Sequence, residues 1–408
     1  MNMLVIGNGF DLAHKRPTRY EDFLLFAGYI MRIYNPQENK AQLQKELANV
    51  SPEIKSYILN AFRGRVISQK SGQVYHKNEA IREMYECLDG NVWYDYFQAI
   101  IKENKMRGKN WIDFESEILE IIQFFDQSIT DLYAPFRSDP KAFRLLPYKV
   151  RMFWSKLDFS KYYRSMGREE NYYISTCLDF VEKTYQDLES LNRCLEIYLD
   201  DCVAKAPVTC YSPDIQKLKV DFVLNFNYTT IPTDIYQSLT SAHYVHGRAA
   251  AGPLKKEFKS NIVLGVNEYW SAPEKDSHTN FNCYKKFVQR IIKETGIDYK
   301  TAIEKMSSEF EKFERIRAQL KYSIGPSYNN VYFFGHSLDT TDGDILREII
   351  QTKGIVTTIF YRNKRQQANQ IANLSKVLGQ NELLERVFSA SPTIIFEQQA
   401  DMAPWPAI

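Results

Sequence analysis

Hydrophobic and polar positions follow two different periods along this chain. Short apolar runs of the length of a buried parallel strand stand near both ends of the chain, and runs with helical spacing fill the middle. The short runs predict strands at 3–6, 221–226, 244–246, 262–266, 331–334, 356–361 and 393–396. Strands that alternate with helices indicate an α/β fold, in which helices cover both faces of a parallel sheet.

The middle of the chain is almost entirely helical in its pattern. Apolar residues recur at helical spacing in 42–50, 54–62, 80–88, 93–103, 114–125, 172–185 and 188–204. A capping box, Thr18-Arg19-Tyr20-Glu21, predicts one more helix that runs to about residue 34. A helical block of this length between two strand regions predicts an insertion into the sheet domain.

Composition and charge exclude several classes of protein. Of the 408 residues, 44% are hydrophobic and 25% are charged, as in folded globular proteins. The net charge of +2 is too balanced for nucleic acid to be the expected main partner. No apolar run reaches the roughly 18 residues of a membrane helix, and no signal peptide pattern opens the chain, so we expect a cytoplasmic protein. The six cysteines form no C-x-x-C pair, which argues against a zinc site.

The first predicted strand runs directly into Gly7-Asn8-Gly9-Phe10-Asp11. Glycines after a strand allow close backbone approach to a ligand, and the N-terminus of the following helix attracts phosphate. The dinucleotide fingerprint has a third glycine where this chain has Leu12. The motif therefore predicts nucleotide binding, with an ordinary tight turn as the alternative.

Two later strands end in polar residues that suit chemistry. Asn227 can donate and accept hydrogen bonds without titrating, and His246, followed by glycine, can titrate near neutral pH. Side chains at the carboxyl ends of parallel strands line the ligand crevice of open α/β sheets. The structural alternatives are a turn or helix cap at Thr229 or Thr230, and a histidine that is simply packed.

A third strand end carries Gly335-His336-Ser337 before a helix. Ser337 and the amides of this turn are candidates for binding ribose or phosphate. Three aspartates follow at 339, 342 and 344, but their spacing does not fit a calcium loop, and Asp342 is better explained as a helix cap. In the middle block, the sequence from Trp111 to Glu117 predicts a capped helix start, with Glu115 facing a cleft as the alternative.

Together these segments resemble the bacteriophage abortive-infection AbiH family. The resemblance rests on residues 6–14, 17–24, 111–115, 226–229, 245–247 and 334–338. One departure is Lys15, where many relatives are expected to have glycine. The resemblance implies defence against phage by shutting down the infected cell. A phage-derived trigger and a homo-oligomer are the partners to be tested.

The order Gly-x-Gly, Asn-Tyr, His-Gly and Gly-x-Ser is also similar to sirtuin-like domains, which bind nicotinamide adenine dinucleotide (NAD). That resemblance implies Asn227 and His246 as catalytic residues. It implies an NAD site at Gly7, Asn8, Gly9, Phe10, Asp11, Gly335, His336 and Ser337. Two departures are Thr229, where the motif usually has an aspartate, and the missing four-cysteine zinc module of the protein deacylases. NAD is then substrate or ligand, and no metal or other cofactor is required.

These resemblances predict a Rossmann-like, sirtuin-related parallel sheet with a large helical insertion. We expect the core in three parts (1–35, 207–268 and 328–408), separated by the helical insertion 36–206 and a charged helical excursion 269–327. The implied activity is hydrolysis of NAD to nicotinamide and ADP-ribose. A non-catalytic nucleotide or ADP-ribose sensor is one alternative. A toxin that acts on nucleic acid through the short basic stretches 255–259 and 362–365 is another.

Overall fold

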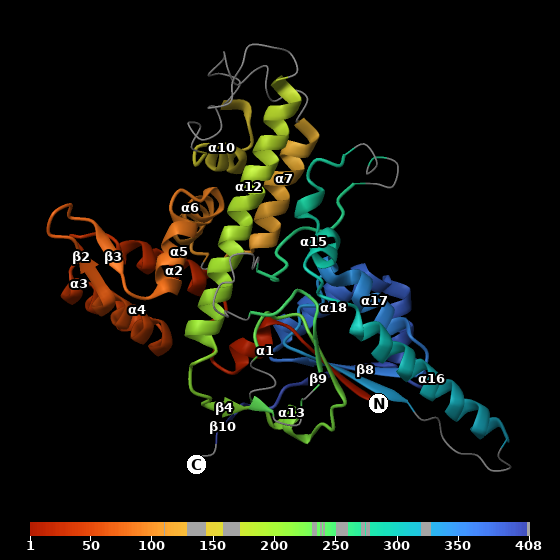
Figure 1. Cartoon of the computed structure of the whole chain (residues 1–408). Coiled ribbons are helices and arrows are strands. Elements are labelled where there is room, and N and C mark those ends of the chain that lie inside the picture. The colour runs from red at the N-terminus through yellow and green to blue at the C-terminus, as the bar shows by residue number, and fades with distance from the viewer. Residues whose placement is uncertain are drawn as a thin grey trace. The chain divides into compact units, whose positions relative to one another are not determined.

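The computed structural model divides the chain into two compact units (Figure 1). Unit 1 comprises residues 1–18, 206–248 and 294–408, and unit 2 comprises residues 19–205 and 249–293. The structure describes residues 1–109, 111–128, 144–157, 172–230, 235–236, 239, 241–249, 260–270, 274, 278–319 and 328–405.

Unit 1 is built on a six-stranded sheet in which every neighbouring pair of strands is parallel. The strands lie in the order β6 (Ala242–Tyr244), β5 (Phe222–Asn225), β1 (Asn2–Ile6), β7 (Asn329–Phe334), β8 (Ile355–Tyr361) and β9 (Ile394–Gln398). Numbered along the chain, this order is 3-2-1-4-5-6, the order of doubly wound dinucleotide-binding sheets. The prediction of an α/β fold with a parallel sheet is confirmed.

The register of the sheet places apolar side chains in continuous rows. Met3 lies opposite Val331 and Val5 lies opposite Phe333, and all four are fully buried. These rows pack in one core with buried residues of the helices α16, α17, α18 and α19. The helices of unit 1 are α1 (Asn8–Ala13), α13 (Pro213–Lys217), α16 (Asp298–Gln319), α17 (Gly343–Gln351), α18 (Lys364–Leu378) and α19 (Gln380–Phe388), and a small sheet joins β4 (Cys210–Tyr211) to β10 (Ala403–Pro404).

Unit 2 is mainly helical, in agreement with the pattern of the middle block. Its helices are α2 (Tyr20–Ile33), α3 (Lys40–Glu46), α4 (Pro52–Gly64), α5 (Glu79–Leu88), α6 (Val92–Met106), α7 (Phe114–Ser128), α10 (Tyr148–Trp154), α12 (Tyr172–Ile197) and α15 (Lys286–Ile292), with a hairpin of β2 (Arg65–Ile67) and β3 (Val74–His76). The two helices expected at 172–185 and 188–204 are instead the single helix α12 and a π-helical turn at Tyr198–Val203. Among the described residues, no helix combines the length and apolar character of a membrane span.

The predicted strand at 262–266 is wrong. Ile262, Val263 and Leu264 are fully buried, but they belong to unit 2 and join no sheet among the described residues. The only bridge that this segment forms there is isolated, between Val266 and Lys285. An apolar run indicates that its residues are buried. A strand also needs backbone hydrogen bonds to a neighbouring strand along its length.

The predicted capping box is displaced by one residue. Helix α2 begins at Tyr20, and the N–H of Arg19 donates to the Asp22 carboxylate at 3.3 Å. Thr18 instead donates its hydroxyl hydrogen to the Asn8 side chain at 2.6 Å. Glu21 accepts the N–H of Ile112 at 2.5 Å, so its carboxylate ties two parts of unit 2 together.

Candidate functional site

The sheet brings the predicted site residues of unit 1 to one edge. Gly7, Asn227, His246 and Gly335 each follow the carboxyl end of a parallel strand, and we call this side of the sheet the carboxyl edge. In Figure 1 the red N-terminal segment enters the sheet beside the blue C-terminal strands. The strand order reverses between β1 and β7, and ligands of open α/β sheets bind at such a switch point.

The loops after β1 and β7 are held together by their backbones. The N–H of Gly7 donates to the Phe334 carbonyl at 3.3 Å, and the N–H of Gly9 donates to the Gly335 carbonyl at 2.8 Å. A Cβ on Gly9 would lie 2.6 Å from that carbonyl oxygen, and Gly335 has a φ of +67°. The glycines therefore allow the two loops to pack on each other, and both amides already have protein partners.

Asn227 joins the loop after β5 to the same region. Its side-chain amide donates to the Gly7 carbonyl at 3.0 Å, while its N–H donates to the side chain of Asn225 at 2.8 Å. Asn225 is fully buried and donates in turn to the Thr229 carbonyl at 3.0 Å. Sequence reasoning did not single out Asn225, although an amide inside an apolar strand is itself a signal of a buried hydrogen-bond network.

Phe10 and Asp11 point into unit 1 instead of lining the open edge. Phe10 is fully buried, and Asp11 is 1% exposed. Thr229 donates its hydroxyl hydrogen to one oxygen of Asp11 at 2.7 Å, and the other oxygen has no hydrogen-bond partner within the described part of the chain. Burial raises the pKa of Asp11 from 3.8 to about 7, against the lowering effects of the Thr229 hydrogen bond and of the positive charge on Arg16.

The imidazole of His14, three residues after Asp11, is buried and is held in its neutral form. The N–H of Ser212 donates to the Tyr236 hydroxyl oxygen at 2.7 Å, so the Tyr236 hydroxyl can donate to His14 Nε2 at 2.9 Å. His14 Nδ1 then donates to the Phe10 carbonyl at 2.7 Å. Burial lowers the pKa of His14 to about 4.

The carboxyl edge also contains a histidine–carboxylate pair. His246 Nε2 lies 3.0 Å from Asp342 Oδ1, and His336 Nε2 lies 3.9 Å from Asp342 Oδ2. His246 is 5% exposed, and its Nδ1 is buried with no hydrogen-bond partner among the described residues. The ring of Phe226 packs edge-on against both imidazoles.

Asp342 is the site residue that sequence reasoning assigned to another role. It stands at the start of α17, but its side chain makes no capping hydrogen bond. Asp339 caps the short 3-10 turn Thr340–Asp342 that precedes α17, by accepting the N–H of Thr341 at 3.2 Å. The signal that could have found Asp342 is its position after a parallel strand that ends at the same edge as His246.

Among the predicted residues, Asn8 and Ser337 are the exposed ones. Ser337 accepts a hydrogen bond through its carbonyl from Asn373 at 3.1 Å, which leaves its hydroxyl at the surface. The His336 carbonyl accepts from Gln370 at 3.0 Å. Two side chains of α18 therefore hold the loop after β7.

The family profile described as "Bacteriophage abortive infection AbiH" matches residues 3–361, which include every residue of this edge. The chain belongs to the AbiH family. It is thus an abortive-infection protein of defence against bacteriophage. No curated protein and no solved structure matches the chain. The matched span of this AbiH protein ends before α18, α19 and β9.

The Trp111–Glu117 segment belongs to unit 2, whereas the residues of the carboxyl edge belong to unit 1. Asp113 accepts hydrogen bonds from the N–H of Glu115 at 3.2 Å and from Ser116 at 2.6 Å, which confirms the capped helix start. The Glu115 carboxylate pairs with Lys286 at 2.8 Å, so this glutamate is part of a buried ion pair. Within the described ranges, no group of three or more metal-ligating side chains comes together.

Proposed function

We propose that unit 1 binds NAD at the carboxyl edge and hydrolyses it to nicotinamide and ADP-ribose. The observation that carries the proposal is the His246–Asp342 pair, whose remaining imidazole nitrogen, Nδ1, is buried without a hydrogen-bond partner in the part of the chain that the structure describes. A buried nitrogen of this kind costs free energy until something bonds to it. A ribose hydroxyl or a water molecule is a suitable partner. The strand order 3-2-1-4-5-6 also supports the proposal, because sheets with this order commonly bind dinucleotides.

The chemistry needs one base and one well-placed water molecule. When Asp342 accepts the hydrogen on His246 Nε2, the imidazole keeps a lone pair on Nδ1. The bond between ribose C1′ and the nicotinamide nitrogen breaks, and the electron pair leaves with neutral nicotinamide. Water adds to C1′, which passes through an oxocarbenium-like state. The water proton goes to His246, directly or through a ribose hydroxyl.

The remaining residues would position the ligand and the loops. Asn227 fixes the loop after β5 against Gly7 through its 3.0 Å hydrogen bond. Asn8 and Ser337 are exposed on this edge and carry the polar groups that can contact ribose or phosphate. Gly9 and Gly335 allow the loops of β1 and β7 to pack closely.

The test is NAD loss and nicotinamide release by the purified full chain. We expect turnover in the parent and a loss of at least about 100-fold in His246→Ala, because a general base typically contributes that much or more. Asn227→Ala should also lose turnover. His243→Ala is the matched control, since His243 is an equally buried histidine on β6 that pairs with Asp298. Turnover that persists unchanged in His246→Ala would refute the proposal.

A second candidate, a non-catalytic sensor of NAD or ADP-ribose, has one observation in its favour. Thr229 occupies the place of the motif aspartate and donates to the buried Asp11. The amides of Gly7 and Gly9 are also already bonded to carbonyl oxygens. Binding of ADP-ribose measured by calorimetry, with no release of nicotinamide from NAD, would favour the sensor.

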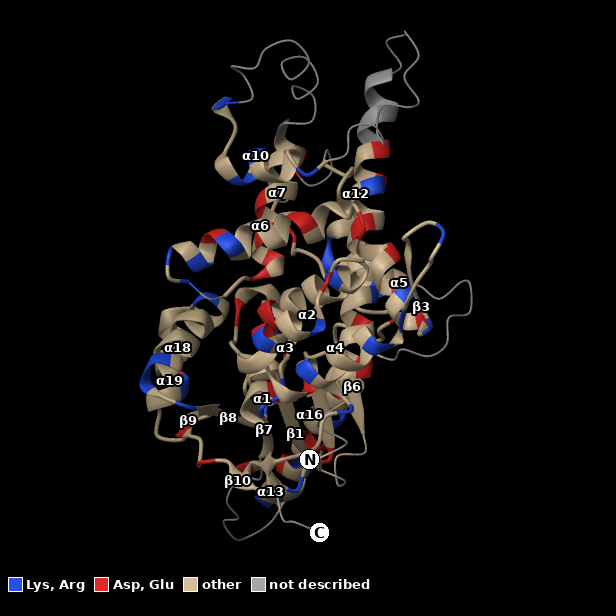
Figure 2. Ribbon diagram, turned by 90° about the vertical axis from the view of Figure 1, so that its left-hand side faces the viewer, with Lys and Arg blue, Asp and Glu red and all other residues tan. Residues whose placement is uncertain are grey.

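Nucleic acid is the third candidate, and one of its two basic stretches, 255–259, lies outside the described residues. Figure 2 shows basic and acidic residues interspersed along α6 and α12 instead of a separate basic face on these helices. Phosphate contacts weaken steeply with salt, so filter binding over a salt series would reveal nucleic-acid binding.

A further inference from the structure

Two histidines face one carboxylate at the carboxyl edge, one on each oxygen. His246 Nε2 lies 3.0 Å from Asp342 Oδ1, and His336 Nε2 lies 3.9 Å from Asp342 Oδ2. Both histidines are buried. The longer distance exceeds that of a hydrogen bond, but charges and dipoles interact more strongly in a buried site than in water. Asp342 is therefore placed to interact with both imidazoles at once.

The loop after β7 decides where His336 carries its hydrogen. The N–H of Leu338 donates to His336 Nδ1 at 2.9 Å. A backbone amide can only donate, so Nδ1 must be the acceptor, and the hydrogen of the neutral ring lies on Nε2. That nitrogen is the one that faces Asp342.

The backbone of this loop is strained in the conformation that makes this hydrogen bond. Leu338 is fully buried and has a φ of +57°, in the left-handed region that residues other than glycine rarely adopt. Such a conformation raises the free energy of the folded state, and it is found most often at functional sites. The loop therefore fixes one tautomer of His336 at a cost in free energy.

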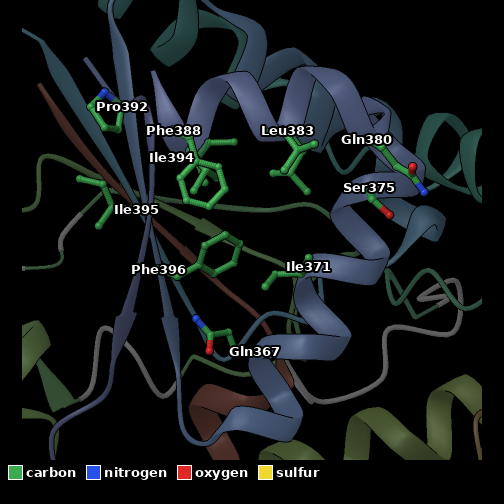
Figure 3. A pocket seen from close by; sticks show the side chains of 12 residues that line it. Gln367, Ile371, Ser375, Gln380, Leu383, Phe388, Pro392, Ile394, Ile395 and Phe396 are labelled. Atoms are coloured by element: carbon green, nitrogen blue, oxygen red, sulfur yellow. The ribbon is translucent and has the colours of Figure 1, made fainter. Parts of the chain in front are cut away.

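Helix α18 also holds this loop. Gln370 donates to the His336 carbonyl at 3.0 Å, and Asn373 donates to the Ser337 carbonyl at 3.1 Å. Figure 3 shows Gln367 and Ile371 of the same helix beside an apolar groove that α18 forms with α19 and β9. The helix therefore lines the groove with one set of side chains and holds the loop of His336 with another.

His246 uses its two nitrogens in the opposite way. Its Nδ1 is buried with no hydrogen-bond partner among the described residues, so this nitrogen has a lone pair that can take a proton. His336 could take a proton on Nδ1 only by losing the hydrogen bond from Leu338, because two N–H groups would then face each other. Of the two histidines, His246 is the one that can change its charge.

Asp342 is the charged group that faces both rings. Phe226 packs edge-on against each imidazole. Arg248 follows His246 by two residues, and its guanidinium lies 5.8 Å from the centre of the Tyr244 ring. The titration of His246 therefore depends on how the carboxylate of Asp342 is held.

We propose that His336 is a positioning residue, which stays neutral and directs its Nε2 hydrogen at Asp342 Oδ2, so that Oδ1 stays on His246. In the proposed reaction, His246 takes the water proton on Nδ1 and becomes a cation that Asp342 stabilises. The proton returns to the solvent when the products leave. A neutral His336 orients the carboxylate without adding a second positive charge. The effect on turnover rests on the proposed NAD hydrolysis, whereas the hydrogen positions and the titration of His246 do not.

The first test is nuclear magnetic resonance of the full chain with isotope-labelled histidine, without NAD. We expect His336 to keep its hydrogen on Nε2 between about pH 5 and pH 8, and His246 to titrate in this range. Comparison with His336→Gln and His246→Ala assigns the signals. A His336 that gains a proton in this range, or that carries its hydrogen on Nδ1, would overturn the proposal.

Two variants separate positioning from packing. His336→Gln keeps an N–H in the place of Nε2, whereas His336→Phe keeps an aromatic ring without an N–H. His336→Phe should raise the pKa of His246, because a carboxylate that loses a donor attracts the imidazolium more strongly. His336→Gln should leave that pKa near its parent value. His243→Phe is the control, since His243 pairs with Asp298 instead. Equal shifts in the Gln and Phe variants, or no shift in either, would overturn the proposal.

Turnover of NAD gives a second measure of the same role. In His336→Phe we expect kcat to fall about tenfold with an unchanged KM, which corresponds to the loss of one interaction of about 1.4 kcal/mol. His336→Gln should keep most of the kcat, and equal losses in both variants would indicate packing alone. Urea denaturation checks that both variants fold; if either does not, the tautomer in the parent still decides. A parent without turnover refutes the proposed NAD hydrolysis alone, because the resonance experiment needs no NAD.

Discussion

Two sets of buried titratable groups, one in each unit, are accommodated in different ways. In the interior of unit 1, burial raises the pKa of Asp11 to about 7 and lowers the pKa of His14 to about 4, so that it favours the neutral form of each. In unit 2, three lysines with buried side chains each lie within 2.7–2.9 Å of a glutamate. These pairs are Lys285 with Glu268, Lys286 with Glu115, and Lys293 with Glu189.

Both arrangements follow from the free-energy cost of burying a charge. A charge in a low-dielectric interior must be neutralised or paired. Paired lysines fix the segments that they join, because breaking the pair leaves a buried charge. Burial shifts the pKa values of Asp11 and His14 far from their ordinary values, and strongly shifted groups cluster at functional sites. The contrast is consistent with the proposal that unit 1 carries the chemistry.

The largest effect should come from separating His246 from its carboxylate. Asp342 acts through His246, so Asp342→Asn should lower turnover by about 10²–10⁴-fold through loss of the correct imidazole tautomer. The expected change in the free energy of unfolding is small by comparison, because Asp342 makes no helix cap. The pH profile of turnover should also shift, which a purely structural role would not cause. An unchanged profile and rate would contradict the contrast between the units.

The opposite result is expected for the ion pairs of unit 2. Lys286→Met leaves Glu115 without its partner, and the free energy of unfolding should fall by about 3 kcal/mol. The double variant Lys286→Met/Glu115→Leu should recover most of that loss, because no unpaired charge remains. Denaturation by urea measures both. Failure of the double variant to recover would show that the pair does more than neutralise charge.

The third effect concerns the glycines of the carboxyl edge. Gly9→Ala should lower the free energy of unfolding by about 1–3 kcal/mol, because its Cβ would meet the Gly335 carbonyl oxygen at 2.6 Å. Gly28→Ala is the matched control in helix α2. Its Cβ would have ordinary contacts at 3.5 Å, so that variant should gain about 0.5–1 kcal/mol. Thermal melts of both variants measure their changes in stability relative to the parent. Changes of the same sign in the two variants would refute this prediction.

The smallest expected effect is a pH dependence of the free energy of unfolding. In the parent, the contributions of Asp11 and His14 to it partly cancel. The pKa of Asp11 is raised in the folded state, so its contribution to stability is complete below pH 3.8 and is lost as the pH rises to about 7. The pKa of His14 is lowered, so its contribution is complete above pH 6.5 and is lost as the pH falls to about 4. Between these limits the two slopes have opposite signs, each at most about 1.4 kcal/mol per pH unit.

Single variants should expose the two slopes separately. In Asp11→Asn, the free energy of unfolding should rise with pH relative to the parent, because only the His14 contribution is left. In His14→Gln it should fall with pH, because only the Asp11 contribution is left. Urea titrations at about pH 4.5 and pH 6.5 measure the difference. Parallel curves for both variants and the parent would show that neither group titrates as its burial implies.

The sequence alone determined the sheet and the edge at which polar residues gather. Apolar runs predict most strands of unit 1 because buried parallel strands need continuous hydrophobic residues. Gly7, Asn227, His246 and Gly335 follow those strands, and parallel strands end at one edge, so the sequence could indicate that these residues lie near one another. Helical spacing likewise indicated the helical character of unit 2.

Only the tertiary structure decided which polar groups meet. Asp342 faces His246 instead of capping its own helix, and Asp11 turns into the interior, where burial raises its pKa to about 7. Glu115 finds its partner in Lys286, 171 residues further along the chain (286 − 115). The physical reason is that periodicity along a chain reports how much each residue is buried. Pairing and pKa depend on side chains contributed by distant segments, which only the folded packing brings together.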